Sequence, residues 1–389
     1  MKLFECQACG QPLYFENDGC ESCGRSVGFL SDRQVLSALD AGEGGRTFDA
    51  LASPERPVRF CANAEHRACN WLVPADDAQD FCTACRHNRT IPALSLPENL
   101  ERWRRLEVAK RRLFYTLLRL RLPLTKRPED PEGLAFDFLS DDGPSAPPVM
   151  TGHASGLITI NIAEADDVER ERRRTGMGEP YRTLLGHLRH EVGHHYWTVL
   201  VERSPDPGTI ERFRALFGDE RADYGEALKR HYAQGAPPDW PERFISAYAS
   251  AHPWEDWAET WAHYLHMVDT LETAGAFGIS TRPKVSRGAE IATTVDFDPH
   301  ANGDLQQLIG AWLPLTFAVN SLNRSMGQPD LYPFVIPPAV IGKLAFVHGC
   351  VHGWATAAES EGAATPPPDG TLRAVIAGLR HPVAAPGGS

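Results

Sequence analysis

The sequence predicts an α+β protein in which small, cysteine-rich N-terminal modules precede a mainly helical domain with a small β-sheet. Three observations predict this fold class. Eight of the nine cysteines lie within the first 85 residues. Short segments at 134–139 and 156–162 alternate or run apolar in a way that is typical of strands. From residue 180 onward, apolar residues recur at helical spacing in several segments.

The length and composition indicate a soluble globular protein of two or three domains. The chain has 389 residues, of which 42% are hydrophobic and 23% charged, and these values exclude a wholly disordered, collagen-like or coiled-coil protein. The formal net charge of −12 argues against broad binding to phosphate backbones. The sequence shows neither a secretory signal nor a long apolar run, so we expect a cytoplasmic protein with no membrane partner.

Residues 1–30 carry the first cysteine cluster, which consists of two C-x-x-C pairs. Such a pair supplies two thiolates from one tight turn, and the segment is too short to fold on apolar burial alone. A glycine follows the second cysteine of each pair, at a position where the turn often needs a positive φ. We therefore predict a zinc ribbon with a closed, structural Zn²⁺ site, whose ligands are Cys6, Cys9, Cys20 and Cys23.

Residues 58–92 carry a second, less regular cluster, for which we predict a second structural Zn²⁺ site. In a reducing compartment such thiols are typical of metal sites rather than disulfides. His66 could replace one cysteine, although a solvated loop histidine is the favoured interpretation, and Cys350 is expected to be a buried, inert thiol. Residues 31–57 are interpreted as a polar connection. The predicted ligands are Cys61, Cys69, Cys82 and Cys85.

Residues 98–128 are predicted to form a basic, amphipathic helical connection. Apolar residues recur at helical spacing among many arginines and lysines up to about residue 122. Such a helix is more often a solvated face than a nucleic-acid contact, so nucleic acid is a weaker candidate partner. Further helices are expected at 180–201, 209–217, 222–232, 253–273 and 302–323, and a mobile tail over 354–389.

The predicted helix at 180–201 contains the pentapeptide H-E-x-x-H, at residues 190–194. On a helix, His190 and His194 lie one turn apart and can bind one Zn²⁺, while Glu191 beside them can act on water. The alternative is that both histidines are satisfied by hydrogen bonds without a metal. Trp197 and Leu200 stand where a metzincin would carry glycine and histidine, which excludes that class.

A third ligand is needed, and the residues leave its identity open. The predicted helix that begins at Pro253 places Glu255 and Glu259 one turn apart, opposite a wall of tryptophans. Glu220 and Asp223 lie nearer to His194 in sequence and also offer carboxylates.

The H-E-x-x-H motif followed by Glu255-x-x-Ala258-Glu259 resembles the gluzincin class of zinc metallopeptidases. Over most of residues 1–350, the chain also resembles a bacterial family of zinc-binding metallopeptidases with an N-terminal zinc ribbon. This resemblance implies a zincin-like metallopeptidase domain over 129–353. The segments that carry the wider likeness are 11–17, 69–74, 88–92 and 254–266.

The resemblance also implies the roles of individual residues. His190, His194 and Glu255 would bind a catalytic Zn²⁺, in addition to the two structural ions, and Glu191 would be the general base. Glu259 would support one of the zinc ligands without binding the metal itself. Glu259 and Glu220 remain alternative third ligands. Tyr248 is our choice for stabilising the oxyanion, ahead of His263, Tyr264 and His195.

The expected activity is zinc-dependent hydrolysis of a peptide or related amide bond, with a peptide or protein substrate. In zincin folds an exposed edge strand pairs with extended substrate beside the metal, and the segment 156–162 resembles that element. The alternative is a zinc-ribbon module that binds nucleic acid or protein and carries an inactive, metal-bound scaffold domain.

Overall fold

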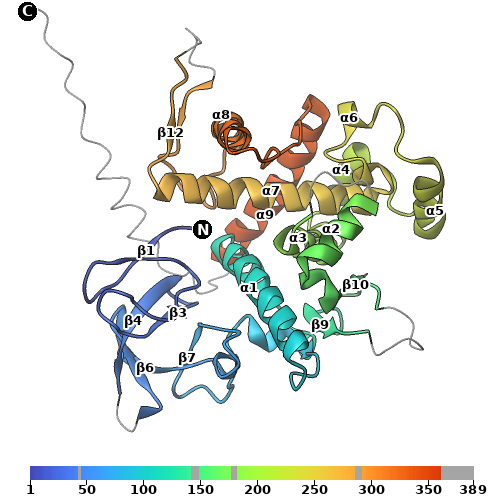
Figure 1. Ribbon diagram of the computed structural model, residues 1–389. Helices are drawn as coiled ribbons and strands as arrows, with labels where there is room; N and C mark the ends of the chain where they lie inside the picture. The colour runs from blue at the N-terminus through green and yellow to red at the C-terminus, as the bar shows by residue number, and fades with distance from the viewer. Residues whose placement is uncertain (43–44, 142–148, 177–181, 285–290, 361–389) are drawn as a thin grey trace, which may run out of the picture.

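The computed structural model describes residues 1–42, 45–141, 149–176, 182–284 and 291–360 (Figure 1). Its N-terminal region is built from strands. A short hairpin is followed by a five-stranded antiparallel sheet in the order β3-β4-β5-β6-β7. The hairpin strands are β1 (Phe4–Glu5) and β2 (Pro12–Leu13), and the sheet contains β3 (Val27–Leu30), β4 (Val35–Ala41), β5 (Phe48–Ala50), β6 (Ser53–Phe60) and β7 (Leu72–Pro74).

This sheet shows that the interpretation of residues 31–57 as a connection was wrong. Strands β4 and β5 and most of β6 lie in that segment. Leu36 and Ala38 of β4 are fully buried, so the segment contributes to the core. The pattern was hidden because β6 contains two prolines and a run of four exposed residues, which weaken the strand signal.

The N-terminal sheet packs directly on helix α1 (Pro97–Arg119), which agrees with the helix predicted from residue 98. The ring of Phe15 lies 5.4 Å from that of Tyr115 on α1, and Phe29 lies 4.8 Å from Trp71. These side chains belong to one apolar core that continues through α1 into the helical region. The ribbon region is therefore packed against the rest of the molecule rather than tethered to it.

A second sheet lies on the other side of α1 and has the order β10-β11-β9-β8. Strands β8, β9 and β11 run parallel, and β10 pairs with β11 in the antiparallel direction. β11 therefore lies inside the sheet, and the expectation that segment 156–162 forms an edge strand was wrong. The edge is β10. The bounds are β8 (Asn88–Thr90), β9 (Ala135–Leu139), β10 (Gly152–Ala154) and β11 (Leu157–Asn161).

The remainder is mainly helical, as the periodicity predicts. A small pair of strands, β12 (Ser280–Thr281) and β13 (Thr293–Thr294), interrupts it. Helix α9 was not among the segments predicted to be helical. It includes residues 354–360, so the prediction that the mobile tail begins at 354 was wrong, and the rest of the predicted tail lies outside the described residues. None of the described helices is long and apolar enough to cross a membrane. The helices are α2 (Asp167–Gly176), α3 (Leu184–Trp197), α4 (Gly208–Phe217), α5 (Tyr224–Gln234), α6 (Trp240–Arg243), α7 (Pro253–Ala276), α8 (Leu305–Ser325) and α9 (Pro338–Ser360).

Helices α3 and α7 cross in close contact near the centre of the helical region (Figure 1). A Cβ atom built on Gly193 of α3 would lie 3.1 Å from the Cα atom of Ala258 and 3.1 Å from the indole of Trp261. The indole nitrogen of Trp257 donates a hydrogen bond of 2.8 Å to the Gly193 carbonyl. The two helix backbones can approach this closely because Gly193 has no side chain.

We expect Gly193→Val to lower the free energy of unfolding by about 1–3 kcal/mol, because the added methyl groups overpack the α3–α7 contact. Denaturant titration measures this change. Gly310→Val is the matched control, since nothing lies within 4 Å of a Cβ built on this α8 glycine, and we expect it to change stability by no more than about 0.5 kcal/mol. Equal losses in the two variants would contradict the assigned role of Gly193.

Candidate metal centre

The first cysteine cluster places four thiols around one point. The sulfur atoms of Cys6 and Cys23 are 3.7 Å apart, and those of Cys9 and Cys20 are 3.6 Å apart. These distances are far too long for disulfides and match the spacing of about 3.8 Å between thiolates on one tetrahedral zinc ion. Gly10 and Gly24 have φ values of +76° and +74°, as expected from their place in the turns.

The second cluster brings its four cysteines together in the same way, and all four are buried. The sulfur atoms of Cys69 and Cys82 are 3.7 Å apart. Backbone amides point at two of the sulfurs: Cys82 N–H donates to Cys61, and Trp71 N–H donates to Cys69. His66 is not part of this cluster and instead packs near Trp103.

Two buried charges of α1 lie directly beneath the second cluster. Glu107 and Lys110 are both fully buried, and the lysine ammonium lies 2.8 Å from the carboxylate. Cys85 Sγ lies 3.8 Å from the other oxygen of Glu107. Burial alone would lower the pKa of Lys110, but Glu107 and Cys85 outweigh burial and raise it, so the lysine stays charged. A cation is thus fixed beside a site that becomes strongly negative when four thiolates bind one zinc ion.

A third group of metal-binding side chains forms where α3 and α7 cross. The ligand atoms of His190, His194 and Glu255 all lie within 4.8 Å of one another. The two Nε2 atoms are 3.2 Å apart, and Glu255 oxygens lie 3.0 Å from His190 and 3.6 Å from His194. Ligand atoms about 2.1 Å from one tetrahedral zinc ion are separated by about 3.4 Å, so the spacing fits.

The polar environment of Glu255 also fits a metal. The side chain is only 1% exposed, yet its Oε2 atom accepts no hydrogen bond from any described residue, although Nε2 of His190 lies 3.0 Å away. Burial of an unpaired carboxylate oxygen is unfavourable unless a partner compensates it. Two imidazoles and one carboxylate are typical ligands of catalytic zinc sites. The sequence reasoning left Glu255, Glu259 and Glu220 as alternatives, and the structure brings Glu255 to the histidine pair.

Glu259 lies behind His190 rather than beside the ligand atoms. Its carboxylate accepts a hydrogen bond of 2.7 Å from Nδ1 of His190 and another of 2.6 Å from the hydroxyl of Ser246. In the neutral imidazole that binds a metal, donation from Nδ1 leaves Nε2 of His190 without a proton and directed at the point where the ligand atoms converge.

Glu191 has a half-buried partner that the sequence analysis did not predict. His187, one turn earlier on α3, donates from Nε2 to Glu191 at 3.1 Å and from Nδ1 to Glu164 at 2.7 Å. Burial alone would raise the pKa of Glu191, but His187 and the two histidines of the motif lower it, so Glu191 is ionised. The contact between His187 and Glu191 is suggested in the sequence only by their spacing of one helical turn. Nothing in the sequence suggests the contact between His187 and Glu164, because these residues are 23 positions apart.

Two tyrosines border the group. The hydroxyl of Tyr224 on α5 donates a hydrogen bond of 2.7 Å to Glu255. The ring of Tyr248 lies 6.0 Å from that of His190, and no described residue forms a hydrogen bond with its hydroxyl. Burial, followed by the charge of Glu255, raises the pKa of Tyr248, so its hydroxyl stays protonated. Tyr248 therefore has a free donor beside the candidate centre.

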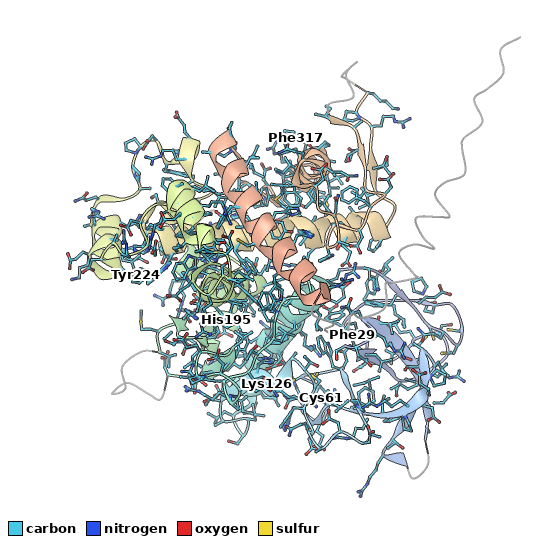
Figure 2. The ribbon with its side chains drawn as sticks, turned by 180° about the vertical axis from the view of Figure 1, so that it is seen from behind. Phe29, Cys61, Lys126, His195, Tyr224 and Phe317 are labelled. Atoms are coloured by element: carbon cyan, nitrogen blue, oxygen red, sulfur yellow. The ribbon has the colours of Figure 1, made fainter. Side chains whose placement is uncertain are left out.

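The alternative residues have other partners. Glu220 accepts a bidentate hydrogen bond from Arg214, and Asp223 caps the N-terminus of α5. His263 lies 2.7 Å from the Tyr332 hydroxyl, and the hydroxyl of Tyr264 lies 3.0 Å from His348. His195, at the centre of Figure 2, is buried against Tyr196.

A further acidic group, Asp269, Glu272 and His300, also meets the spacing of a metal site. However, cations already compensate its charge. Arg189 forms an ion pair with Asp269, and Arg119 lies 3.1 Å from Glu272. The terminal amine of Met1 lies 3.4 Å from Glu272 as well. This cluster is a structural network that joins α1, α3, α7 and the N-terminus.

The Glu164–His187 pair predicts a pH dependence of stability. Burial alone would lower the pKa of His187, but Glu164 and Glu191 outweigh burial and raise it from 6.5 to about 9. A raised folded-state pKa stabilises the fold fully below pH 6.5, and this contribution is lost as the pH rises through about 9. We expect the difference in unfolding free energy between the wild type and His187→Gln to shrink over that interval. Urea titrations from pH 6 to pH 10 measure it, and a constant difference would contradict the assignment.

Comparison with known proteins identifies the family of the chain. Residues 99–350 match the family described as "Putative zinc-binding metallo-peptidase", and residues 3–96 match a zinc-ribbon domain. Uncharacterized proteins of Mycobacterium bovis and of two Mycobacterium tuberculosis strains are 43% identical over 352 residues, which is 90% of this chain and 95% of each relative. No solved structure matches the chain. The chain therefore belongs to this zinc-binding metallo-peptidase family, and its N-terminal region is a zinc ribbon.

Proposed function

We propose that the protein hydrolyses peptide bonds with a catalytic zinc ion held by His190, His194 and Glu255. The observation that supports this proposal most strongly is the convergence of these three side chains within 4.8 Å, with the buried, ionised Glu191 next to them on α3. Zinc bound there would act as a Lewis acid that polarises the substrate carbonyl and makes water more acidic.

The residues of the chain then supply the proton transfers. Glu191 accepts a proton from the attacking water and later delivers it to the nitrogen of the leaving amine. Its contact with His187 keeps the carboxylate ionised and fixed in orientation before reaction. Tyr248 donates its free hydroxyl proton in a hydrogen bond to the carbonyl oxygen as negative charge develops there.

We propose that the peptide binds in extended form along β10. This edge strand pairs with β11 on one side, so its other edge can add a substrate strand. It also lies beside the centre, because the ring of His153 on β10 stacks 5.9 Å from that of His194.

The alternative of an inactive, nucleic-acid-binding module has less support. Arginines of α1 that would contact phosphates form ion pairs within the protein: Arg102 with Asp166 and Arg112 with Glu16.

The clustered thiols support a reducing compartment, and we propose that the enzyme acts in the cytoplasm.

Elemental analysis of the purified full-length protein tests the three metal sites together. We expect about three zinc ions per chain, falling to about two in the His190→Ala, His194→Ala double variant, because the two cysteine sites are closed and take no ligand from α3. About two zinc ions in both proteins would contradict the proposed catalytic site.

Glu191→Gln tests the general base. We expect it to lower kcat on a labelled casein substrate by about 10²–10⁴-fold, because the amide cannot take the proton, while zinc content stays the same. Glu226→Gln, on the exposed face of α5, serves as the matched control with wild-type turnover. Unchanged turnover in Glu191→Gln would contradict the mechanism.

A further inference from the structure

A cleft of about 540 Å³ opens beside the candidate centre. Three of its lining residues connect it to the zinc ligands. Trp197 follows His194 by three residues on α3, and Trp254 directly precedes Glu255 on α7. Tyr224, labelled in Figure 2 at the start of α5, donates its hydroxyl hydrogen bond to Glu255. A side chain in this cleft would therefore lie next to a peptide bond held at the centre.

Aromatic rings form one wall of the cleft. The rings of Trp197 and Trp254 meet edge to face at 5.5 Å, and Tyr224 lies 5.9 Å from Trp254. Tyr224 is 37% exposed, so part of its ring is open to a ligand. The faces of such rings attract cations, and their apolar area also suits the methylene chain of lysine or arginine.

The rim of the cleft carries an excess of negative charge. Glu202 and Asp223 are exposed and form no ion pair with any described residue. The single lining cation, Arg221, is held by Asp219 at 2.8 Å, and the buried Glu220 is neutralised by Arg214. Asp223 caps α5 with one oxygen, so its other oxygen and the carboxylate of Glu202 are available to a ligand. The guanidinium of Arg221 is already paired, so the cleft favours a cation over an anion.

We propose that this cleft binds the lysine or arginine side chain of a peptide substrate, at a residue that flanks the scissile bond. This inference rests on the proposed peptidase function and adds the substrate class to it. The basic head group pairs with Glu202 and Asp223, and its aliphatic stem lies along Trp254 and Tyr224. The cleft would then select where the enzyme cleaves.

Cleavage of a peptide library by the full-length, zinc-loaded protein tests the specificity. Mass spectrometry of the products should show lysine and arginine enriched at least tenfold at one position next to the cleaved bond. The double variant Glu202→Gln, Asp223→Asn should lose that enrichment, while its asparagine still caps α5. Glu226→Gln, which lies outside the cleft, should retain it. Cleavage without a basic preference would overturn this inference and leave the proposed function standing.

A binding measurement separates the two proposals. N-acetyl-arginine amide, titrated into the Glu191→Gln variant, should shift the indole N–H signals of Trp197 and Trp254 in NMR spectra, and N-acetyl-leucine amide should not. Adding Glu202→Gln and Asp223→Asn should abolish the shifts. Equal or larger shifts with the leucine amide would overturn the inference. Arginine-specific shifts without any cleavage by the wild type would support the cleft and contradict the peptidase function.

Discussion

The close contact between α3 and α7 at Gly193 is the constraint on which the rest of the centre depends. His190 and His194 come from one helix and Glu255 from the other, so the three ligand atoms converge only at this separation. The hydrogen bond from Trp257 to the Gly193 carbonyl fixes how far each helix slides along the other. The glycine in the motif is therefore a packing requirement, in addition to the chemistry of its neighbours.

Buried polar partners then orient the reactive side chains. Glu259 accepts hydrogen bonds from His190 and from Ser246. His187 donates one hydrogen bond to Glu164 and another to Glu191. Glu164 lies in the short helical turn that follows β11, so the sheet also positions the centre. Such fixed contacts reduce the reorganisation that a reaction requires.

The sequence predicted the helical half and the candidate centre well, because their signals are local. The helical spacing of α7 and the pentapeptide of α3 place His190, His194, Glu255 and Glu259 on two helix faces without knowledge of the fold, and the family resemblance then singles out Glu255 as the third ligand. Three features depend on tertiary contacts and escaped prediction. They are the position of β10 at an edge of its sheet, the packing of 31–57 into a sheet, and the partner of His187, since Glu164 lies in a different element.

The buried Lys110 links zinc in the ribbon to the folding of the whole chain. With zinc bound, its charge balances Glu107 and the thiolates of the second cluster. After metal loss, the cysteines would take up protons and this charge balance beneath α1 would change. Since α1 packs on both sheets and on α3, loss of zinc from the ribbon would also disturb the helices that carry the centre. A shortage of the metal would then destabilise the helical domain itself as well as empty the candidate centre.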